Sequence, residues 1–282
     1  MYISKTIFFA LFLSFMFINP VTADLSVHFL DVFGGDAVLL EQDGHTMLID
    51  SGTKDSGNLT RLYLKNLNIE SLDSVMITNQ DEGRIGAMTN ILNATPASEF
   101  YMGQWNTTGG AYQDILNKLE EDQTPVTCVA PGDHVLFTDD VTIDILTPVT
   151  NTKDVMPDIL VPLITYGDIK FLLMGSKPDL YGVQAQIIRV GDHGSMRGTT
   201  TTLLSQVKPE IAVISTGSYS GGNPAQSTIS NLENSGALVV RTDLDGTIII
   251  KTDGTGYTIG KLRMEPEITI SLVSVIETRP PL

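Results

Sequence analysis

Cysteine is nearly absent from this chain: Cys128 is the single one among 282 residues. One cysteine cannot form an internal disulfide, so the fold must depend on its hydrophobic core. Cys128 lies in an apolar stretch, residues 126–129, that is typical of a strand. We therefore expect a small buried side chain there rather than a reactive thiol.

Basic residues are also scarce, since 17 Lys and Arg face 33 Asp and Glu, for a formal net charge of −16. Such a surface repels phosphate backbones, which argues against nucleic acid as a partner. The excess of acidic side chains is typical of a highly soluble protein. A length of 282 residues suits one large domain or two small ones.

The N-terminus has the pattern of a secretory signal peptide. Lys5 precedes an apolar run, residues 6–18, and the small residues 21–23 stand before Asp24. We predict a signal peptide over residues 1–23 and a secreted or extracytoplasmic protein. The apolar run is short for a spanning helix of about 20 residues, yet an uncleaved membrane anchor stays open as the alternative.

Short apolar stretches with tight turns fill most of the mature chain. Three predicted strands open it, and a helical spacing of apolar residues follows over residues 58–68. Further strands alternate with turns and short helices as far as residue 259. This order predicts an α+β fold. The main later strands are expected at residues 160–166, 169–174, 186–190, 211–215 and 247–251.

One polar loop stands out among these elements. Residues 73–78 read as a buried strand, residues 79–84 as a polar loop, and a helix is expected over residues 85–94. The carboxyl end of a strand is a usual place for a site in proteins that alternate strands and helices. The candidate site is therefore placed at residues 79–84.

This loop resembles the signature loop of the metallo-β-lactamase superfamily, Thr-His-x-His-x-Asp-His-Ile-Gly-Gly-Met. Thr78 and residues 85–88 keep its frame. Residues 30–37 and 43–52, with Asp36 and Asp50, resemble the ComEC-type competence branch of that superfamily. The resemblance implies an αββα four-layer sandwich over residues 24–260, followed by an extension of unknown role over residues 261–282.

The family's metal ligands are largely replaced in this sequence. In the signature loop, Asn79 and Asp81 stand for two histidines, Gly83 for the aspartate and Arg84 for the last histidine. Asparagine is a weak ligand, and a guanidinium has no acceptor at all. The resemblance thus implies a pseudoenzyme without a metal or other cofactor. The altered or retained site positions are Asn79, Asp81, Gly83, Arg84, Ser176, Asp192, His193 and Asn223.

Three explanations of this pattern stay open. Arg84 can act as an internal cation that lies within about 4 Å of Asp50, Asp81 or Asp192, or it can be an ordinary surface arginine. Alternatively, Asp50, Asp81, Asp192 and His193, with Glu82 beside them, hold zinc or a hard divalent cation and hydrolyse phosphodiesters, as a nuclease-like enzyme would.

In the third explanation the protein is an exported binding or structural module. It would use the sandwich for stability and its loops for a protein or cell-surface partner. A metal-free acid–base pair of Asp192 and His193 is a further alternative. Adjacent loop residues rarely act together in this way.

Overall fold

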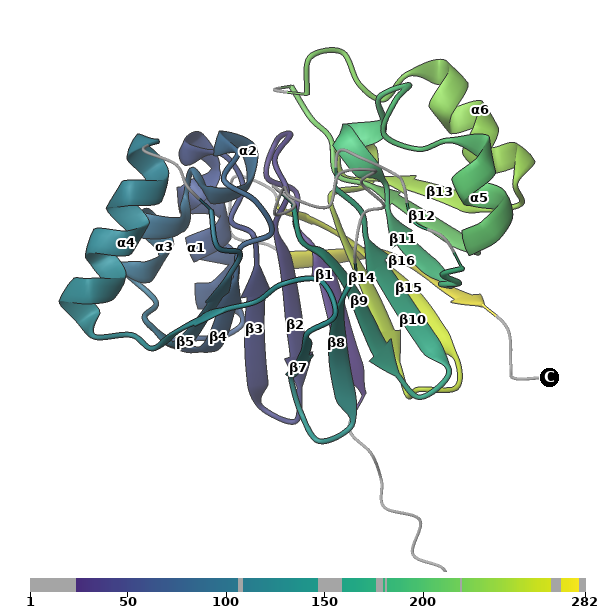
Figure 1. Ribbon diagram of the computed structural model, residues 1–282. Coiled ribbons are helices and arrows are strands. Elements are labelled where there is room, and N and C mark those ends of the chain that lie inside the picture. The colour runs from purple at the N-terminus through teal and green to yellow at the C-terminus, as the bar shows by residue number, and fades with distance from the viewer. Residues whose placement is uncertain are drawn as a thin grey trace, which may run out of the picture.

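The strands pair into two sheets that lie face to face, with helices on the outer side of each (Figure 1). The structure is a computed structural model. It describes residues 24–105, 109–146, 159–175, 180, 182–218, 220–264 and 270–278, with no side-chain description for residues 264 and 270–278. The predicted signal peptide, residues 1–23, falls outside this range. The predicted α+β sandwich is confirmed.

Within the described residues, the first sheet has nine strands and the second has seven. The first sheet runs β16 (Ile270–Thr278), β15 (Tyr257–Met264), β14 (Thr247–Thr252), β1 (Leu25–Phe29), β2 (Val38–Gln42), β3 (His45–Ile49), β4 (Leu72–Met76), β5 (Ala97–Met102) and β6 (Val126–Cys128). The second runs β13 (Leu238–Arg241), β12 (Ile211–Ile214), β11 (Ile187–Arg189), β10 (Ile169–Leu173), β9 (Val161–Tyr166), β8 (Val141–Leu146) and β7 (His134–Leu136).

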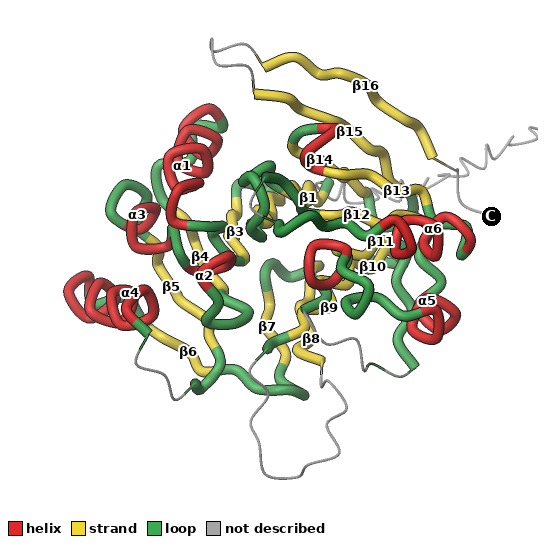
Figure 2. Tube along the Cα trace, turned by 90° about the horizontal axis from the view of Figure 1, so that it is seen from above, coloured by secondary structure: helices red, strands yellow, loops and turns green. Residues whose placement is uncertain are grey.

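Helices of the first half of the chain cover one outer face, and those of the second half cover the other (Figure 2). The first group is α1 (Gly57–Asn66), α2 (Glu82–Ile85), α3 (Met88–Leu92) and α4 (Gly110–Asp122). The second group is α5 (Thr201–Val207) and α6 (Gln226–Asn234), whereas the short helix α7 (Thr242–Asp245) follows β13 and contacts β14 and β15 of the first sheet. Two 3-10 turns, η1 (Lys54–Ser56) and η2 (Gly191–Gly194), lie at the ends of strands.

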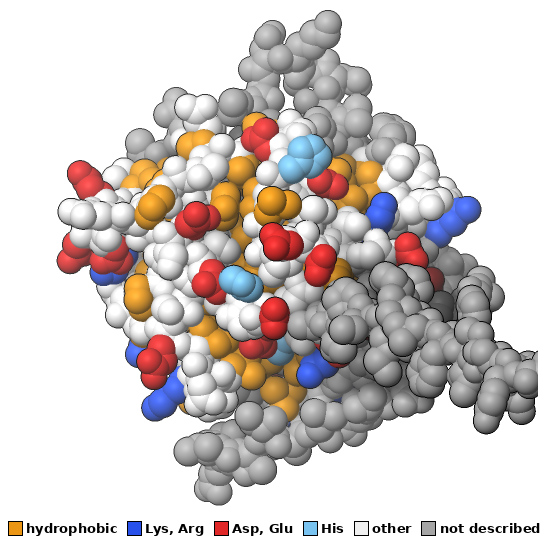
Figure 3. All heavy atoms as spheres, turned by 90° about the horizontal axis from the view of Figure 1, so that it is seen from below, with side chains coloured by type: hydrophobic (Ala, Val, Ile, Leu, Met, Phe, Trp, Pro, Cys, Tyr) orange, Lys and Arg blue, Asp and Glu red, His pale blue; other side chains and the backbone are white. Residues whose placement is uncertain are grey.

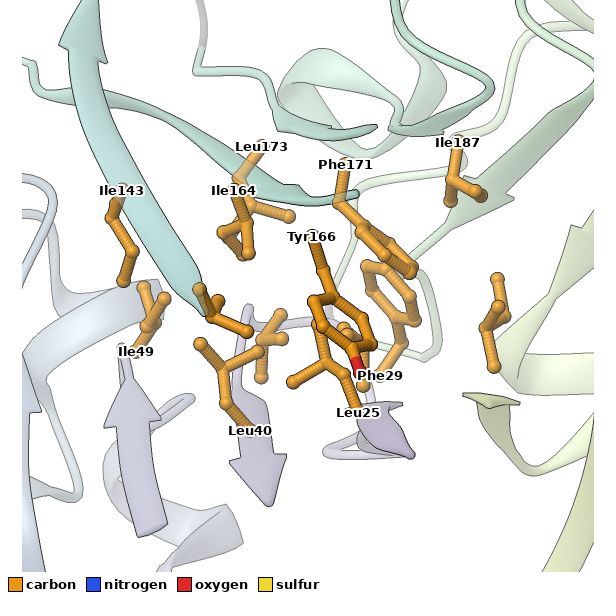
Figure 4. Packing of buried hydrophobic residues seen from close by; sticks show 14 of the residues in the cluster. Leu25, Phe29, Leu40, Ile49, Ile143, Ile164, Tyr166, Phe171, Leu173 and Ile187 are labelled. Atoms are coloured by element: carbon orange, nitrogen blue, oxygen red, sulfur yellow. The ribbon is translucent and has the colours of Figure 1, made fainter. Parts of the chain in front are cut away.

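The main core lies between the two sheets. Alternate residues of β1, namely Leu25, Val27 and Phe29, point inward and are fully buried, because side chains alternate between the faces of a strand. Figure 4 shows Phe29 beside Phe171 from the opposite sheet. Two further apolar clusters pack the helices onto the outer faces. The sandwich therefore holds the strand ends, and the loops on them, in fixed positions.

Several element predictions need correction. The helix expected over residues 85–94 is two short helices, α2 and α3. Cys128 is exposed, not buried. It lies on β6, the edge strand of the first sheet, and all three residues of that strand are exposed. The final strand, β16, pairs antiparallel with β15 and extends the first sheet.

Among the described residues, no helix combines the length and the apolar character that a membrane span requires.

Candidate functional site

Four charged side chains come together where the sheets meet the polar loops, and all four are at least nine-tenths buried. Two are carboxylates and two are guanidiniums, so their formal charges cancel. We call them the buried quartet: Asp36, Asp50, Arg84 and Arg189.

Arg84 bridges the two carboxylates of the quartet. Its Nη2 lies 2.8 Å from Asp36 Oδ2, and its Nη1 donates to Asp50 Oδ2 at 3.2 Å. Nη1 also donates to the hydroxyl of Thr78 at 2.6 Å. The prediction that Arg84 lies within about 4 Å of a carboxylate is thus confirmed at Asp50. The surface-arginine alternative is wrong, since Arg84 is 6% exposed.

Arg189 approaches the same carboxylates from the opposite sheet. Its Nη1 donates to Asp50 Oδ2 at 3.3 Å, and its Nε lies 3.7 Å from Asp36 Oδ1. Its Nη2 donates to the backbone carbonyl of Met174 at 3.2 Å. Arg189 is on β11, whereas the other three members come from the first half of the chain. The quartet therefore joins the two halves of the sandwich through charge.

The backbone around the quartet is tied together by hydrogen bonds between loops. The amide of Asp36 donates to the carbonyl of Gly83 at 3.0 Å, and the amide of Ser51 donates to the carbonyl of Arg84. Gly35 permits this close approach, because a Cβ there would lie 2.5 Å from the Gly83 carbonyl oxygen. Asp50 itself adopts a left-handed conformation, with φ of 62°. The quartet thus sits on a rigid, closely packed support.

The remaining acceptor sites of Asp50 are also filled. Its Oδ1 accepts from the backbone amide of Thr78 at 2.8 Å, and the Thr78 hydroxyl donates to Oδ2 at 2.7 Å. A carboxylate with this many donors is anchored in one orientation. Asp50 therefore has little capacity left for a metal ion or a ligand.

Burial and ion pairing act in opposite directions on these acids. Burial alone would raise the pKa of Asp36, but Arg189 and Arg84 outweigh it and bring that pKa below its usual value. At Asp50 burial prevails, and its pKa lies above the usual value despite the same two arginines. The pKa of Arg84 is raised: burial opposes its charge, but Asp36, Asp50 and Asp81 together exceed that effect.

Asp81 and Asn79 pair with each other rather than with the quartet. The Asn79 Nδ2 donates to Asp81 Oδ2 at 2.5 Å, and the Asp81 backbone amide donates to Asn79 Oδ1 at 2.9 Å. Of the three carboxylates considered for Arg84, Asp81 is thus not its ion-pair partner, and Asp36 pairs with Arg84 beside Asp50. Asp81 contributes to the charge around Arg84 only as a neighbour.

Asp192 and His193 have separate hydrogen-bond partners. Asp192 Oδ2 accepts from the Ser195 hydroxyl at 2.6 Å, and His193 Nδ1 lies 2.9 Å from the backbone carbonyl of Ser215. Both residues adopt left-handed conformations. The ion pairs of Arg84 are with Asp36 and Asp50, not with Asp192. Each side chain has a structural partner, and no hydrogen bond joins the two.

The last three predicted positions contribute little to the quartet. Gly83 supplies only its backbone, and a Cβ added there would meet nothing within 4 Å. Asn223 is half-buried, and its backbone carbonyl accepts from the Thr216 hydroxyl at 2.9 Å. Ser176 lies outside the described residues.

The residues present do not fit the zinc that the fold implies. Zinc needs three or four imidazole, thiolate or carboxylate donors around one point. In the part of the chain that the structure describes, no three His, Cys, Asp or Glu side chains form such a group. Two guanidiniums instead pair with Asp50, one of the candidate ligands, and they would repel a metal cation beside it.

Sequence reasoning did not assign Arg189 to the site. A signal was present, since Arg189 interrupts the otherwise apolar run of residues 187–190 directly before the loop at residues 191–195. A lone charge inside a buried strand calls for a buried partner. Asp36 was noted as part of a retained motif, but its pairing with Arg84 could not be inferred from spacing.

Comparison with known proteins agrees with this architecture. Residues 30–113 match the model of the metallo-beta-lactamase superfamily. The metallo-beta-lactamase fold protein YhfI from Bacillus subtilis superposes with a TM-score of 0.57 at 13% identity, over 82% of this chain and 100% of that one. At this identity the likeness establishes the fold alone.

Two curated proteins are similar over most of the chain. ComE operon protein 3 of Bacillus subtilis is 24% identical over 197 residues, which cover 66% of this chain and 25% of that protein. Recombination protein 2 of Haemophilus influenzae is 26% identical over 234 residues, which cover 78% of this chain and 28% of that protein. This chain spans about a quarter of the length of these relatives. The resemblance to the ComEC-type branch is confirmed.

Proposed function

We propose that this chain, which carries a metallo-beta-lactamase superfamily domain, is a catalytically silent member of that fold and serves as an exported binding or structural module. The observation that carries this proposal is the buried quartet. Arg84, which stands where the resembled loop has a metal-binding histidine, and Arg189 both pair with the buried carboxylate of Asp50 between the halves of the sandwich.

The electrostatics of the quartet explain why such a replacement is stable. Two buried carboxylates without a counter-ion would be strongly unfavourable. A bound dication or two guanidiniums can each supply the missing positive charge. A guanidinium is part of the chain, so the charge is present at every metal concentration. The two halves of the sandwich therefore remain joined by ion pairs, but the site lacks the Lewis acid that hydrolysis would require.

Export is proposed from the N-terminal sequence, where a positive start, an apolar run and small residues precede Asp24. The partner would be a protein or another component of the cell surface. The net charge of −16 argues against nucleic acid.

Metal analysis of the purified protein tests the proposal. We expect less than stoichiometric zinc, no change in melting temperature with either a chelator or added zinc, and no hydrolysis of a chromogenic phosphodiester. A ligand bound only to the native state raises the melting temperature, so an unaltered value indicates no metal site. Tightly held zinc together with chelator-sensitive turnover would instead establish the metal-dependent hydrolase that the sequence left open.

A further inference from the structure

A cavity of about 970 Å³ opens on the outer face of the first sheet, away from the buried quartet. Its floor is formed by β1, β2 and β14. One wall is the end of α1 with the loop that follows it, and the other is β15. None of the quartet residues lines it. Small-molecule sites in proteins typically measure about 300–1,000 Å³, so the size suits a small organic ligand.

The sheet register explains why this face is hollow. Ser26 stands between Glu41 on β2 and Lys251 on β14, and Lys251 is followed by Thr258 on β15. These four outward side chains form one row across the sheet, and none of them is a large apolar residue of the kind that packs under a helix. In the next row Gly260 adds no side chain at all, and a Cβ there would make only ordinary contacts with Ile249 at 3.8 and 3.9 Å.

A chain of three polar side chains is built into the floor. The Tyr63 hydroxyl lies 2.7 Å from His28 Nδ1, and His28 Nε2 lies 3.0 Å from Glu41 Oε2. Tyr63 and His28 are 3% and 4% exposed, whereas the Glu41 side chain is 29% exposed. All three side chains line the cavity, and the Glu41 carboxylate at the end of the chain is the most exposed of them. Its Oε2 lies beside a buried imidazole, whose other ring nitrogen is hydrogen-bonded to a buried phenol.

This arrangement is typical of a supported ligand-binding group. A carboxylate fixed by a buried partner loses less conformational freedom when it binds, because its orientation is set in advance. Burial and Glu41 also raise the pKa of the Tyr63 hydroxyl, so Tyr63 stays neutral and acts as a support rather than as a base. Because Glu41 is the most exposed of the three side chains, it is the group that a ligand would contact first.

The charges around the opening indicate what kind of ligand fits. Five carboxylates line the cavity against one lysine, Lys251. Figure 3 likewise shows more acidic than basic side chains on the face of the molecule seen from below. A recess lined by one sign of charge concentrates ions of the opposite sign. The acids are Asp24, Glu41, Asp43, Glu70 and Asp73.

We propose that this cavity binds a small organic cation that carries protonated amines, with Glu41 as the anchoring carboxylate. The apolar side chains of Ile249 and Leu262, which also line the cavity, would contact the ligand's methylene groups. The site shares no residue with the buried quartet. It therefore stands or falls independently of whether the fold is catalytically silent.

Calorimetric titration of the purified protein with spermidine, at about 0.15 M ionic strength, tests the proposal. We expect saturable binding that Glu41→Gln weakens about tenfold or more, because a charge-assisted contact is lost. Lys251→Ala should strengthen binding, since it removes the one like charge. Lys251 is exposed, so this second variant tests the site without disturbing the buried side chains.

The matched control is Glu120→Gln, an exposed carboxylate on α4 that does not line the cavity. Its affinity for spermidine should equal that of the unaltered protein. Equal weakening by Glu41→Gln and Glu120→Gln would mean diffuse attraction to an acidic protein and would overturn the proposal. Tighter binding of a lysine-rich peptide than of spermidine would also overturn it, in favour of a protein partner.

Discussion

Arg84 Nη2 lies 2.8 Å from Asp36 Oδ2, and only 7% and 4% of the two side chains are exposed. In this sequence Arg84 stands at a position where the resembled loop has a metal-binding histidine. The pair therefore links the loss of a ligand to the gain of an internal charge. The interior of the sandwich remains neutral, because Arg189 compensates the second carboxylate of the quartet.

Removing one arginine should leave a buried carboxylate without compensation. We expect Arg189→Met to lower the free energy of unfolding by about 3–5 kcal/mol, measured by urea denaturation. Arg61→Met, at an exposed position on α1, is the control and should alter it by at most about 0.5 kcal/mol. The double variant Asp36→Asn/Arg189→Met should cost less than the sum of its two single variants. Strict additivity would contradict the coupling.

Acid should act on the quartet through Asp36. The pKa of Asp36 is lower in the folded than in the unfolded state, so its ionisation contributes stability that is complete above the unfolded value of about 3.9. This contribution is lost as the pH falls from that value through the folded-state pKa. The unfolding free energy of Asp36→Asn should accordingly fall less steeply below about pH 4 than that of the unaltered protein. Parallel curves would contradict this prediction.

Restoring the ligands of the signature loop should create a zinc site. The variant Asn79→His/Asp81→His/Gly83→Asp/Arg84→His supplies imidazole and carboxylate donors, and the space beside Gly83 accommodates a side chain. We expect added zinc to raise the melting temperature of this variant only. Arg189→Met on the same background should tighten binding, because it removes a cation beside Asp50. A folded variant whose melting temperature does not change when zinc is added would contradict the prediction.

Two glycines at the site should respond to alanine in opposite ways. At Gly35 a Cβ would lie 2.5 Å from the Gly83 carbonyl oxygen and 2.8 Å from the Thr53 nitrogen, so Gly35→Ala should cost about 1–3 kcal/mol. At Gly83, which is in α2 and has open space, alanine should stabilise by about 0.5–1 kcal/mol. Thermal or urea unfolding of both variants gives the comparison, and equal effects would contradict the described packing.

The support behind Glu41 can be tested without a ligand. Tyr63→Phe leaves His28 Nδ1 without its hydroxyl partner in a buried position, which should cost about 1–3 kcal/mol. Tyr101→Phe removes a hydroxyl that contacts Glu99 at an exposed place and should cost less than about 0.5 kcal/mol. Similar losses of unfolding free energy in the two variants would contradict the role assigned to Tyr63.

The sequence by itself determined the type and order of most elements, because apolar periodicity and turn residues act over short distances. It also identified Asp50 and Arg84 as members of one site, since both follow predicted strands in loops that resemble one family. Helix ends were less certain. Packing decided that the helix after the signature loop is divided into α2 and α3, and that Cys128 is at an open sheet edge.

Only the tertiary structure decided which charges meet. Asp36, Asp81 and Asp192 all lie in loops that resemble the family's motifs. Asp81 and Asp192 nevertheless accept hydrogen bonds from nearby side chains and do not join the quartet. Arg189 joins the quartet because the sandwich brings β11 against the loops of the first sheet. Such contacts connect residues that are far apart in the chain. Their partners follow from how the two sheets stack, which no local pattern encodes.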